Sequence, residues 1–164
     1  MAFVTTAIGT ATGPHKAYNI DFAVGAAKSN LRADVQLVQA LFRIAHFELS
    51  PAFDPPAGEK GIEVDGKVGP ATLRFILHWQ RFAKSQGVKI LLDGTLDPFR
   101  KQGEFSTIAH VRYALEILNN ACHNKCLDQN LDNYKTLPDR DDIPPELRGE
   151  LALPQRVIAK QYAK

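Results

Sequence analysis

The sequence contains very little cysteine and no long apolar run. Its 164 residues include two cysteines, Cys122 and Cys126, which are too few for the disulfide framework of a small secreted domain. No apolar stretch is long enough to cross a bilayer, which argues against a membrane protein. The net charge is only +2, so nucleic acid is not indicated as a partner either.

The first residues of the sequence make a poor signal peptide. Residues 1–14 lack a basic start, and threonines and glycines interrupt their apolar residues, unlike a secretory signal peptide. We therefore expect a chain that is cytoplasmic as synthesised, or one that reaches the cell envelope by a route without a cleavable signal. Apolar residues make up 45% and charged residues 23%, which is typical of one globular domain with modest extensions.

Recognisable catalytic motifs do not occur. The sequence has no H-E-x-x-H, no G-x-S-x-G and no P-loop, and its five histidines are scattered. We accordingly predict no catalytic residue and no cofactor. One alternative stays open, because a glycosidase needs only two carboxylates and four flank a single loop. These four are Glu48, Asp54, Glu59 and Glu63.

Residues 122–126, Cys-His-Asn-Lys-Cys, bring thiol and imidazole groups together along the chain. A structural zinc needs four ligands, and its usual knuckle separates two cysteines by two residues rather than three. Cysteines at positions i and i+4 of one helix also project side by side, which strains a disulfide. We predict free thiols and no metal site.

Hydrophobic periodicity divides the chain into three parts. Residues 1–29 predict an extended segment, in which residues 3–6 pair with an alternating segment that contains Tyr18, Ile20 and Phe22. Residues 30–127 contain three helical patterns. Residues 128–164 predict a linker rich in Asp, Asn and Pro, followed by a short amphipathic helix at 153–164 that docks on the body or on a partner.

The three helices have recognisable ends. The first is expected at 31–48 with Asn30 as N-cap, and the third from Ser106 to Cys122 or Leu127. The second is the best defined, because Gly69 precedes a proline suited to the first helical position and Gly87 suits a left-handed end.

The second helix has two distinct faces. Its apolar stripe is expected to be buried, and this includes Trp79, for which core packing is favoured over stacking on a sugar. Its other face is basic and contains no acidic residue on the helix itself. The members of the basic face are Arg74, His78, Arg81 and Lys84.

A short motif occurs twice. Residues 64–70, Val-Asp-Gly-Lys-Val-Gly-Pro, and residues 92–98, Leu-Asp-Gly-Thr-Leu-Asp-Pro, share the form apolar-D-G-x-apolar-[GD]-P. The aspartate accepts backbone N–H groups, glycine permits a positive φ, and proline favours the next turn. Local turn chemistry therefore explains the motif without a ligand.

The order of these motifs resembles the peptidoglycan-binding-like domain family. The matching residues are Asp34-Val35, Val38-Gln39-Ala40-Leu41, the first D-G motif with Ala71-Thr72, Trp79-Gln80-Arg81-Phe82, and the second D-G motif. Residues 24–30 also resemble the lead-in of phage-tail and secretion-associated members. The resemblance covers residues 24–120. It departs from the family in a longer loop at 50–61, in Asp97 where glycine is usual, and throughout 128–164.

This resemblance implies a mainly α fold: a three-helix peptidoglycan-binding-like core with an N-terminal extended segment and a C-terminal wrap or helix. The implied function is non-catalytic recognition of bacterial cell-wall peptidoglycan, through its glycan or stem peptide, in a phage-tail or contractile secretion setting. A structural or adaptor protein that binds a protein partner through its C-terminal segment is the alternative. A small cell-wall hydrolase is the third hypothesis.

Six residues are candidates for ligand binding. Asp65 and Asp93 are hydrogen-bond acceptors for a hydroxyl or amide, although a loop cap explains them better. Phe53 is an aromatic residue in a Pro-rich loop, where it either stacks on a ligand or anchors the loop. Basic side chains suit the carboxylates of a stem peptide, although a solvated helix face is the simpler explanation. These basic candidates are Lys67, Arg74 and His78.

Overall fold

The computed structural model describes residues 1–9, 13–49, 51–100 and 110–158. Its elements, in chain order, are β1 (Phe3–Gly9), β2 (Gly13–Asn19), β3 (Val24–Gly25), α1 (Arg32–Arg43), a π-helical turn η1 (Ile44–Glu48), α2 (Pro70–Ser85), β4 (Thr95–Leu96), α3 (Ala114–Asp128), a 3-10 turn η2 (Leu137–Asp139) and α4 (Pro145–Leu151).

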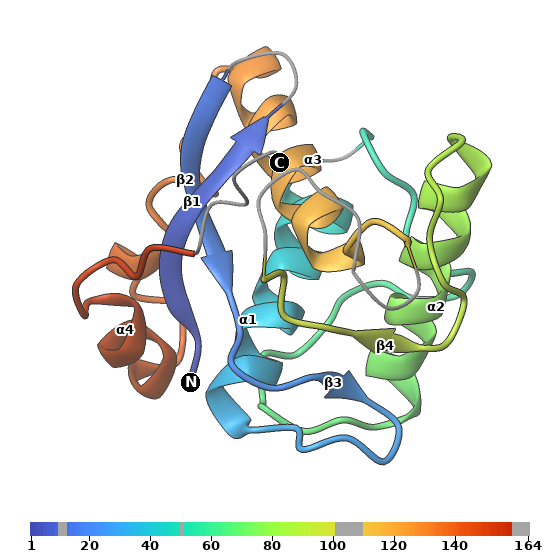
Figure 1. Cartoon of the computed structure of the whole chain (residues 1–164), viewed down its shortest axis with the longest axis horizontal. Helices are drawn as coiled ribbons and strands as arrows, with labels where there is room; N and C mark the ends of the chain where they lie inside the picture. Colours follow the sequence, from blue (N-terminus) through green and yellow to red (C-terminus); the bar gives the residue numbers. More distant parts are fainter. Residues whose placement is uncertain (10–12, 50, 101–109, 159–164) are drawn as a thin grey trace.

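The fold is a small α/β structure, so the expectation of a mainly α, three-helix fold is wrong. The chain is 41% helical and 12% strand, and the strands form two small sheets. One sheet is the β1–β2 hairpin, which packs against α3 (Figure 1). The other pairs β3 with β4, two strands of two residues each, which are too short to show a periodic pattern in the sequence.

The N-terminal hairpin confirms the predicted pairing. β1 and β2 are antiparallel, with Phe3 opposite Asn19. Tyr18 and Ile20 are fully buried as expected, whereas Phe22 lies beyond the strand and is 52% exposed. Asn119 of α3 fixes the hairpin, because its side-chain amide accepts the Tyr18 N–H at 2.8 Å and donates to the Tyr18 carbonyl at 2.9 Å. One amide side chain therefore satisfies a backbone N–H and a backbone carbonyl that would otherwise need a neighbouring strand.

Helix α1 supplies the centre of the core. Val35, Val38 and Phe42 are fully buried, as its apolar stripe predicts. The predicted N-cap is wrong: Leu31 is the N-cap residue, and Asn30 instead bonds both the N–H and the carbonyl of Gly25 at 2.9 Å. The π-helical turn continues α1 to the predicted end of the helix.

Helix α2 matches its prediction closely. It begins at Pro70 after Gly69, and Gly87 takes a φ of 84° beyond its last turn. Trp79 is fully buried, and its indole N–H donates to the Ala114 carbonyl at 3.1 Å. Trp79 is thus a core residue, as favoured from the sequence, and it ties α2 to the start of α3.

Helix α3 begins later than predicted. Ser106 and Ile108 lie outside the described residues, but the helix starts at Ala114 rather than before it. The reason lies just upstream, where His110 takes a φ of 52° and the Arg112 N–H donates to the Lys89 carbonyl at 2.8 Å. This pairing with the segment after α2 keeps residues 110–113 out of the helix.

The C-terminal helix lies earlier than predicted. α4 starts at Pro145, which suits the first helical position, and its Leu147 and Leu151 are buried against the body. Residues 153–158 are not helical, and Arg156 donates its N–H to the Val4 carbonyl of β1 at 2.8 Å. Pro154 explains why α4 does not continue into this segment. Residues 159–164 of the predicted helix lie outside the described residues.

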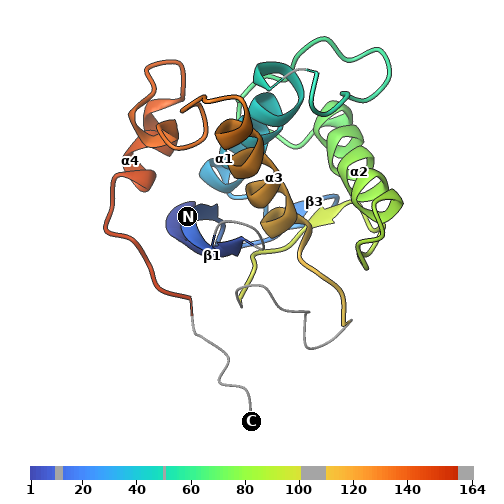
Figure 2. The same cartoon turned by 90° about the horizontal axis from the view of Figure 1, so that it is seen from above.

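The hairpin packs against α3 and α4, and α2 packs against α3 and β4. Figure 2 shows α1 and α3 side by side at the centre, with α4 on one side and α2 on the other. The loop at 51–69 connects the end of η1 to the start of α2 (Figure 1). In the described part of the chain, no helix is long and apolar enough to cross a bilayer.

Candidate functional site

The two D-G loops are closed turns held from within. Oδ1 of Asp65 accepts the Lys67 N–H at 2.9 Å and the side-chain amide of Gln39 at 2.9 Å. Burial works in the opposite direction, but these hydrogen bonds lower the pKa of the Asp65 carboxyl. Asp93 accepts the Gln80 amide at 3.0 Å in the same way. Both aspartates therefore act as loop caps in this structure.

The basic face of α2 is less basic than its helix suggests. The loop at 51–69 brings Glu59 against Arg74, whose Nε donates to the glutamate at 2.9 Å. This acidic residue comes from outside the helix, so the helical pattern alone could not reveal it. Lys67 is exposed and lies in the first D-G loop.

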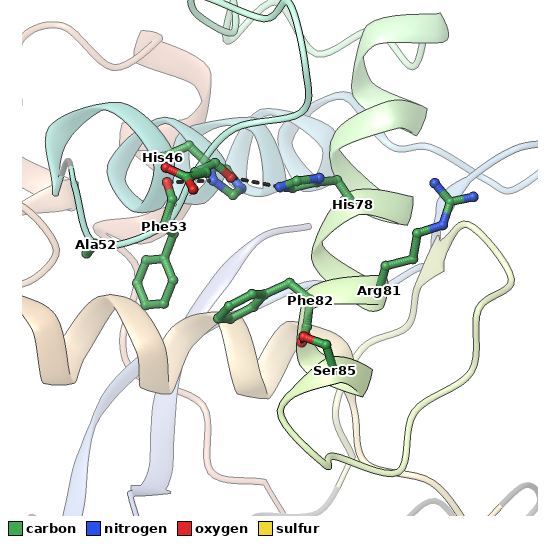
Figure 3. A pocket seen from close by; sticks show the side chains of 8 residues that line it. His46, Ala52, Phe53, His78, Arg81, Phe82 and Ser85 are labelled. Carbon is green, nitrogen blue, oxygen red and sulfur yellow. Dashed lines mark hydrogen bonds between the residues drawn. The ribbon is translucent and has the colours of Figure 1, made fainter.

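Phe53 and His78 meet in one hollow, which is the candidate site. A cavity of about 380 Å³ lies between the loop that follows η1 and the outer face of α2 (Figure 3). Cavities of roughly 300 Å³ and above hold small ligands in proteins, so the size suits one sugar ring or one short peptide unit. Its lining residues are His46, Ala52, Phe53, Asp54, His78, Arg81, Phe82 and Ser85.

Two aromatic rings form the apolar wall of the hollow. The ring centroids of Phe53 and Phe82 are 5.5 Å apart and their planes are inclined at 77°. Phe53 also packs edge-on against the buried Trp79, at 5.6 Å between centroids. Phe53 is therefore both a loop anchor and a partly exposed wall, so the two interpretations of this residue do not exclude one another.

Two histidines hold the loop that carries Phe53. Nδ1–H of His46 donates to the Phe53 carbonyl at 3.3 Å, and Nε2–H of His78 donates to the next carbonyl, that of Asp54, at 2.7 Å. His46 is only 3% exposed, and this burial lowers its pKa to about 4, so its ring is neutral at pH 7. Figure 3 shows both contacts as dashed lines on the same side of the hollow.

The rim carries one charge of each sign. Asp54 and Arg81 are exposed, and within the described residues neither makes an ion pair. The guanidinium of Arg81 extends from α2 away from the rings of Phe53 and Phe82 (Figure 3). The Ser85 hydroxyl donates to the Phe82 carbonyl at 2.6 Å and completes the polar edge. The hollow thus combines an aromatic wall with donors and acceptors around it.

The carboxylates that the sequence groups around one loop have separate roles. Glu48 accepts Nη1 and Nη2 of Arg140 at 2.6 and 2.8 Å, and these bonds lower its pKa although burial opposes them. Glu59 pairs with Arg74, and Asp54 lies at the hollow. Arginines therefore hold Glu48 and Glu59 in ion pairs, and Glu63, the fourth carboxylate of this group, is exposed.

The thiol and imidazole groups of the Cys-His-Asn-Lys-Cys segment also have separate environments. Cys122 and Cys126 are free and buried. His123 instead stacks on His15 of the hairpin, with the ring centroids 3.9 Å apart. Among the described residues, no three His, Cys, Asp or Glu side chains are grouped to hold a metal ion.

Phe53 and His78 are both candidates from the sequence, but no pattern in the sequence indicates that they line one hollow. His46 lies in a helical stripe of apolar residues and gives no signal of its own. Phe82 belongs to the apolar stripe of its helix, and Asp54 is predicted only as one member of a possible acid pair. The sequence offers one indication of this site. A proline-rich loop that contains an aromatic residue is expected to pack against other aromatic residues, and the neighbouring helix has several.

No family model, curated protein or solved structure matches this chain. The ordered motifs and the hollow are therefore the two observations from which a function can be argued.

Proposed function

We propose that this protein recognises bacterial cell-wall peptidoglycan without cleaving it, and that the hollow beside α2 is its binding site. The observation that carries the proposal is the meeting of Phe53, His78 and Arg81 in one cavity of about 380 Å³. The order of the D-G and Gln motifs, which resembles the peptidoglycan-binding-like family, supplies the class of ligand. A phage-tail or contractile secretion setting belongs to the same proposal.

The D-G aspartates, which are ligand-binding candidates from the sequence, do not line this hollow. Asp65 and Asp93 have their carboxylates occupied by backbone and glutamine donors, so they support the fold. The longer loop at 50–61, in contrast, contributes Phe53 and Asp54 to the hollow. The departure from the family pattern is therefore the part of the chain that builds the proposed site.

The arrangement suits recognition of a polymer unit. An aromatic wall provides apolar contact with a sugar face or an alanine methyl group, and rim groups that donate or accept hydrogen bonds fix the orientation. His46 and His78 hold the wall in place before the ligand arrives, which reduces the entropy lost on binding.

Co-sedimentation with purified sacculi tests the proposal. Wild-type protein is expected to pellet with sacculi at both low and physiological salt, since screened charge attraction alone would disappear at the higher salt. Phe53→Ala is expected to weaken this binding by at least about fivefold, from the loss of aromatic contact. Release of soluble fragments from labelled sacculi, measured in parallel, would instead indicate a hydrolase.

A matched control is available elsewhere on the surface. Phe22 is 52% exposed and does not line the hollow, so Phe22→Ala removes a phenyl ring without touching the proposed site. Phe22→Ala should pellet like wild type, and both variants should keep the wild-type circular dichroism spectrum. Absence of pelleting by the wild type at either salt would overturn the proposal.

A further inference from the structure

We propose that the outer edge of β1 is a docking site for an extended segment of a partner protein, and that residues 153–158 of this chain occupy the site when the partner is absent. We call these residues the strap. The partner segment carries an arginine followed two residues later by an aliphatic side chain, as Arg156 and Ile158 do in the strap. This inference concerns a surface other than the hollow and is independent of the proposed function.

The strap lies along the edge of β1 that does not pair with β2. The Arg156 N–H donates to the Val4 carbonyl at 2.8 Å, and the Gln155 side-chain amide donates to the hydroxyl of Thr6, two residues further along β1. Figure 1 shows the strap in red, where it turns back from α4 to β1. The edge of a strand pairs through its backbone with extended chains of many sequences, so this edge is not restricted to the strap.

The side chain of Arg156 occupies a niche beside this edge. Its Cζ lies 3.4 Å from the centroid of the Phe3 ring, and its Nη1 donates to Asp21 at 3.0 Å. Burial raises the pKa of the Asp21 carboxyl, but hydrogen bonds from Arg156 and the amino terminus lower it below its ordinary value, so it is ionised at pH 7. A planar guanidinium stacks on a ring and donates in its own plane to a carboxylate at the same time, whereas an ammonium does not. The niche therefore selects arginine.

The strap is attached at few points. Ile158 is the second anchor and is 8% exposed. Residues 152–157 are exposed, and Val157, which lies between the two anchors, is 85% exposed. A segment with so little buried apolar area opens at a much lower free-energy cost than the whole chain unfolds. The strap is therefore a cover that a competing segment can replace.

The tether decides which kind of segment can compete. Because the strap directly follows α4, it is held near the edge at an effective concentration on the order of 1 mM. A second copy of this chain offers the same contacts without the tether, so it loses to the strap at lower concentrations. A segment that belongs to a different folded protein adds contacts beyond the edge itself. This is the class of partner that displaces the strap.

Fluorescence anisotropy with a labelled synthetic peptide tests this inference. The peptide, Ala-Leu-Pro-Gln-Arg-Val-Ile with an amidated end, copies residues 152–158. It is titrated with the full chain, either wild type or with Arg156→Ala, which removes the anchor of the strap and empties the niche. We expect saturable binding to the variant, with a Kd on the order of 0.1 mM. Binding to wild type should be at least about fivefold weaker, because its own strap competes.

Two controls isolate the role of the arginine. Lys84→Ala removes an exposed cation from α2 and leaves the strap unchanged, so this variant should bind the peptide as weakly as wild type does. A second peptide, with alanine in place of arginine, should bind the Arg156→Ala chain at least about fivefold more weakly than the first peptide. All three proteins should give the same circular dichroism spectrum.

Amide chemical-shift mapping locates the bound peptide. When the peptide is added to the labelled Arg156→Ala chain, we expect the largest shifts at Val4 and Asp21, with Phe53 and Phe82 of the hollow unchanged. Shifts away from β1, equal affinity for wild type and variant, or no binding to either would overturn the inference. Equal binding of the alanine peptide would contradict the selection of arginine. Elution of the wild-type chain as a dimer at the concentrations of the titration would show that a second copy, and not a different protein, occupies the edge.

Discussion

Gln39 of α1 and Gln80 of α2 make the same three hydrogen bonds to the two D-G loops. Each side-chain amide donates to an aspartate, Asp65 or Asp93, at 2.9 or 3.0 Å, and each amide oxygen accepts the N–H of the glycine that follows, at 2.9 Å. Each amide group also donates to a loop carbonyl, that of Lys67 or Thr95. The sequence repeat is therefore a structural repeat, in which one glutamine closes one loop.

This relationship predicts a stability cost for losing either glutamine. Gln80 is 2% exposed, so Gln80→Leu leaves the Gly94 N–H and the Thr95 carbonyl without their partner in a dry environment. We expect the free energy of unfolding to fall by about 1–3 kcal/mol, measured by urea denaturation. Gln86→Leu at the exposed end of α2 is the control and should change it by less than about 0.5 kcal/mol.

The first D-G loop also requires its glycine. Gly66 has a φ of 75°, and a Cβ there would lie 2.5 Å from Cγ and 3.1 Å from the carbonyl oxygen of Arg32. Gly58 has a φ of 82° but no atom within 4 Å of such a Cβ. Gly58→Ala should therefore cost about 1 kcal/mol from backbone strain alone, and Gly66→Ala at least about 2 kcal/mol. Equal costs in urea denaturation would contradict the close packing of this loop on α1.

Burial of His46 predicts a specific pH dependence. The pKa of His46 is about 4 in the folded chain and 6.5 when unperturbed. Between pH 4 and pH 6.5, His46 is therefore mostly protonated in the unfolded chain and mostly neutral in the folded chain. The contribution of His46 to stability is therefore constant above pH 6.5 and is lost as the pH falls toward 4. Between pH 7.5 and 4.5 this loss amounts to about 2–3 kcal/mol.

The variant His46→Gln isolates this effect. Its glutamine amide keeps a donor near the Phe53 carbonyl but does not titrate, whereas every carboxylate still titrates in both proteins. The difference in unfolding free energy between wild type and variant should therefore shrink by the stated amount as the pH falls. A difference that stays constant with pH would show that His46 is accessible to protons in the folded chain.

The thiols should be protected in the folded protein. Cys122 is 0% and Cys126 4% exposed, and burial raises the pKa of both thiols, so little reactive thiolate is present. In native buffer at pH 8 we expect Ellman's reagent to label both cysteines at least about tenfold more slowly than it does in urea. Fewer than two reactive thiols per unfolded chain would contradict the free state of these cysteines.

The parts of the fold that follow from local patterns could be predicted from the sequence. Gly69-Pro70 and Gly87 mark the ends of α2, and the alternation around Tyr18 marks the hairpin. The fold class was wrong because two contacts are non-local. Val24 pairs with Leu96, which is far away in the sequence, and Asn119 of α3 bonds to Tyr18 of the hairpin. Neither contact leaves a periodic signal in the sequence.

In the candidate site, too, local features could be predicted from the sequence and non-local contacts could not. Phe53 and His78 could be chosen by residue type, because an aromatic residue in a loop and a polar residue on a helix are common in binding sites. Their meeting depends on the path of the loop, which His46 and His78 fix through two neighbouring carbonyls. The pairing of Arg74 with Glu59 depends on the same path, so the charge of the site could not be predicted from α2 alone.

The central claim is that the wall polymer binds at the hollow and not at the D-G loops. Amide chemical-shift mapping by nuclear magnetic resonance, with soluble glycan fragments of peptidoglycan added to the labelled chain, tests it most directly. The account predicts the largest shifts at Phe53, Asp54 and Phe82, with Gly66 and Gly94 unchanged. Shifts concentrated at Gly66 and Gly94, with none around Phe53, would contradict it.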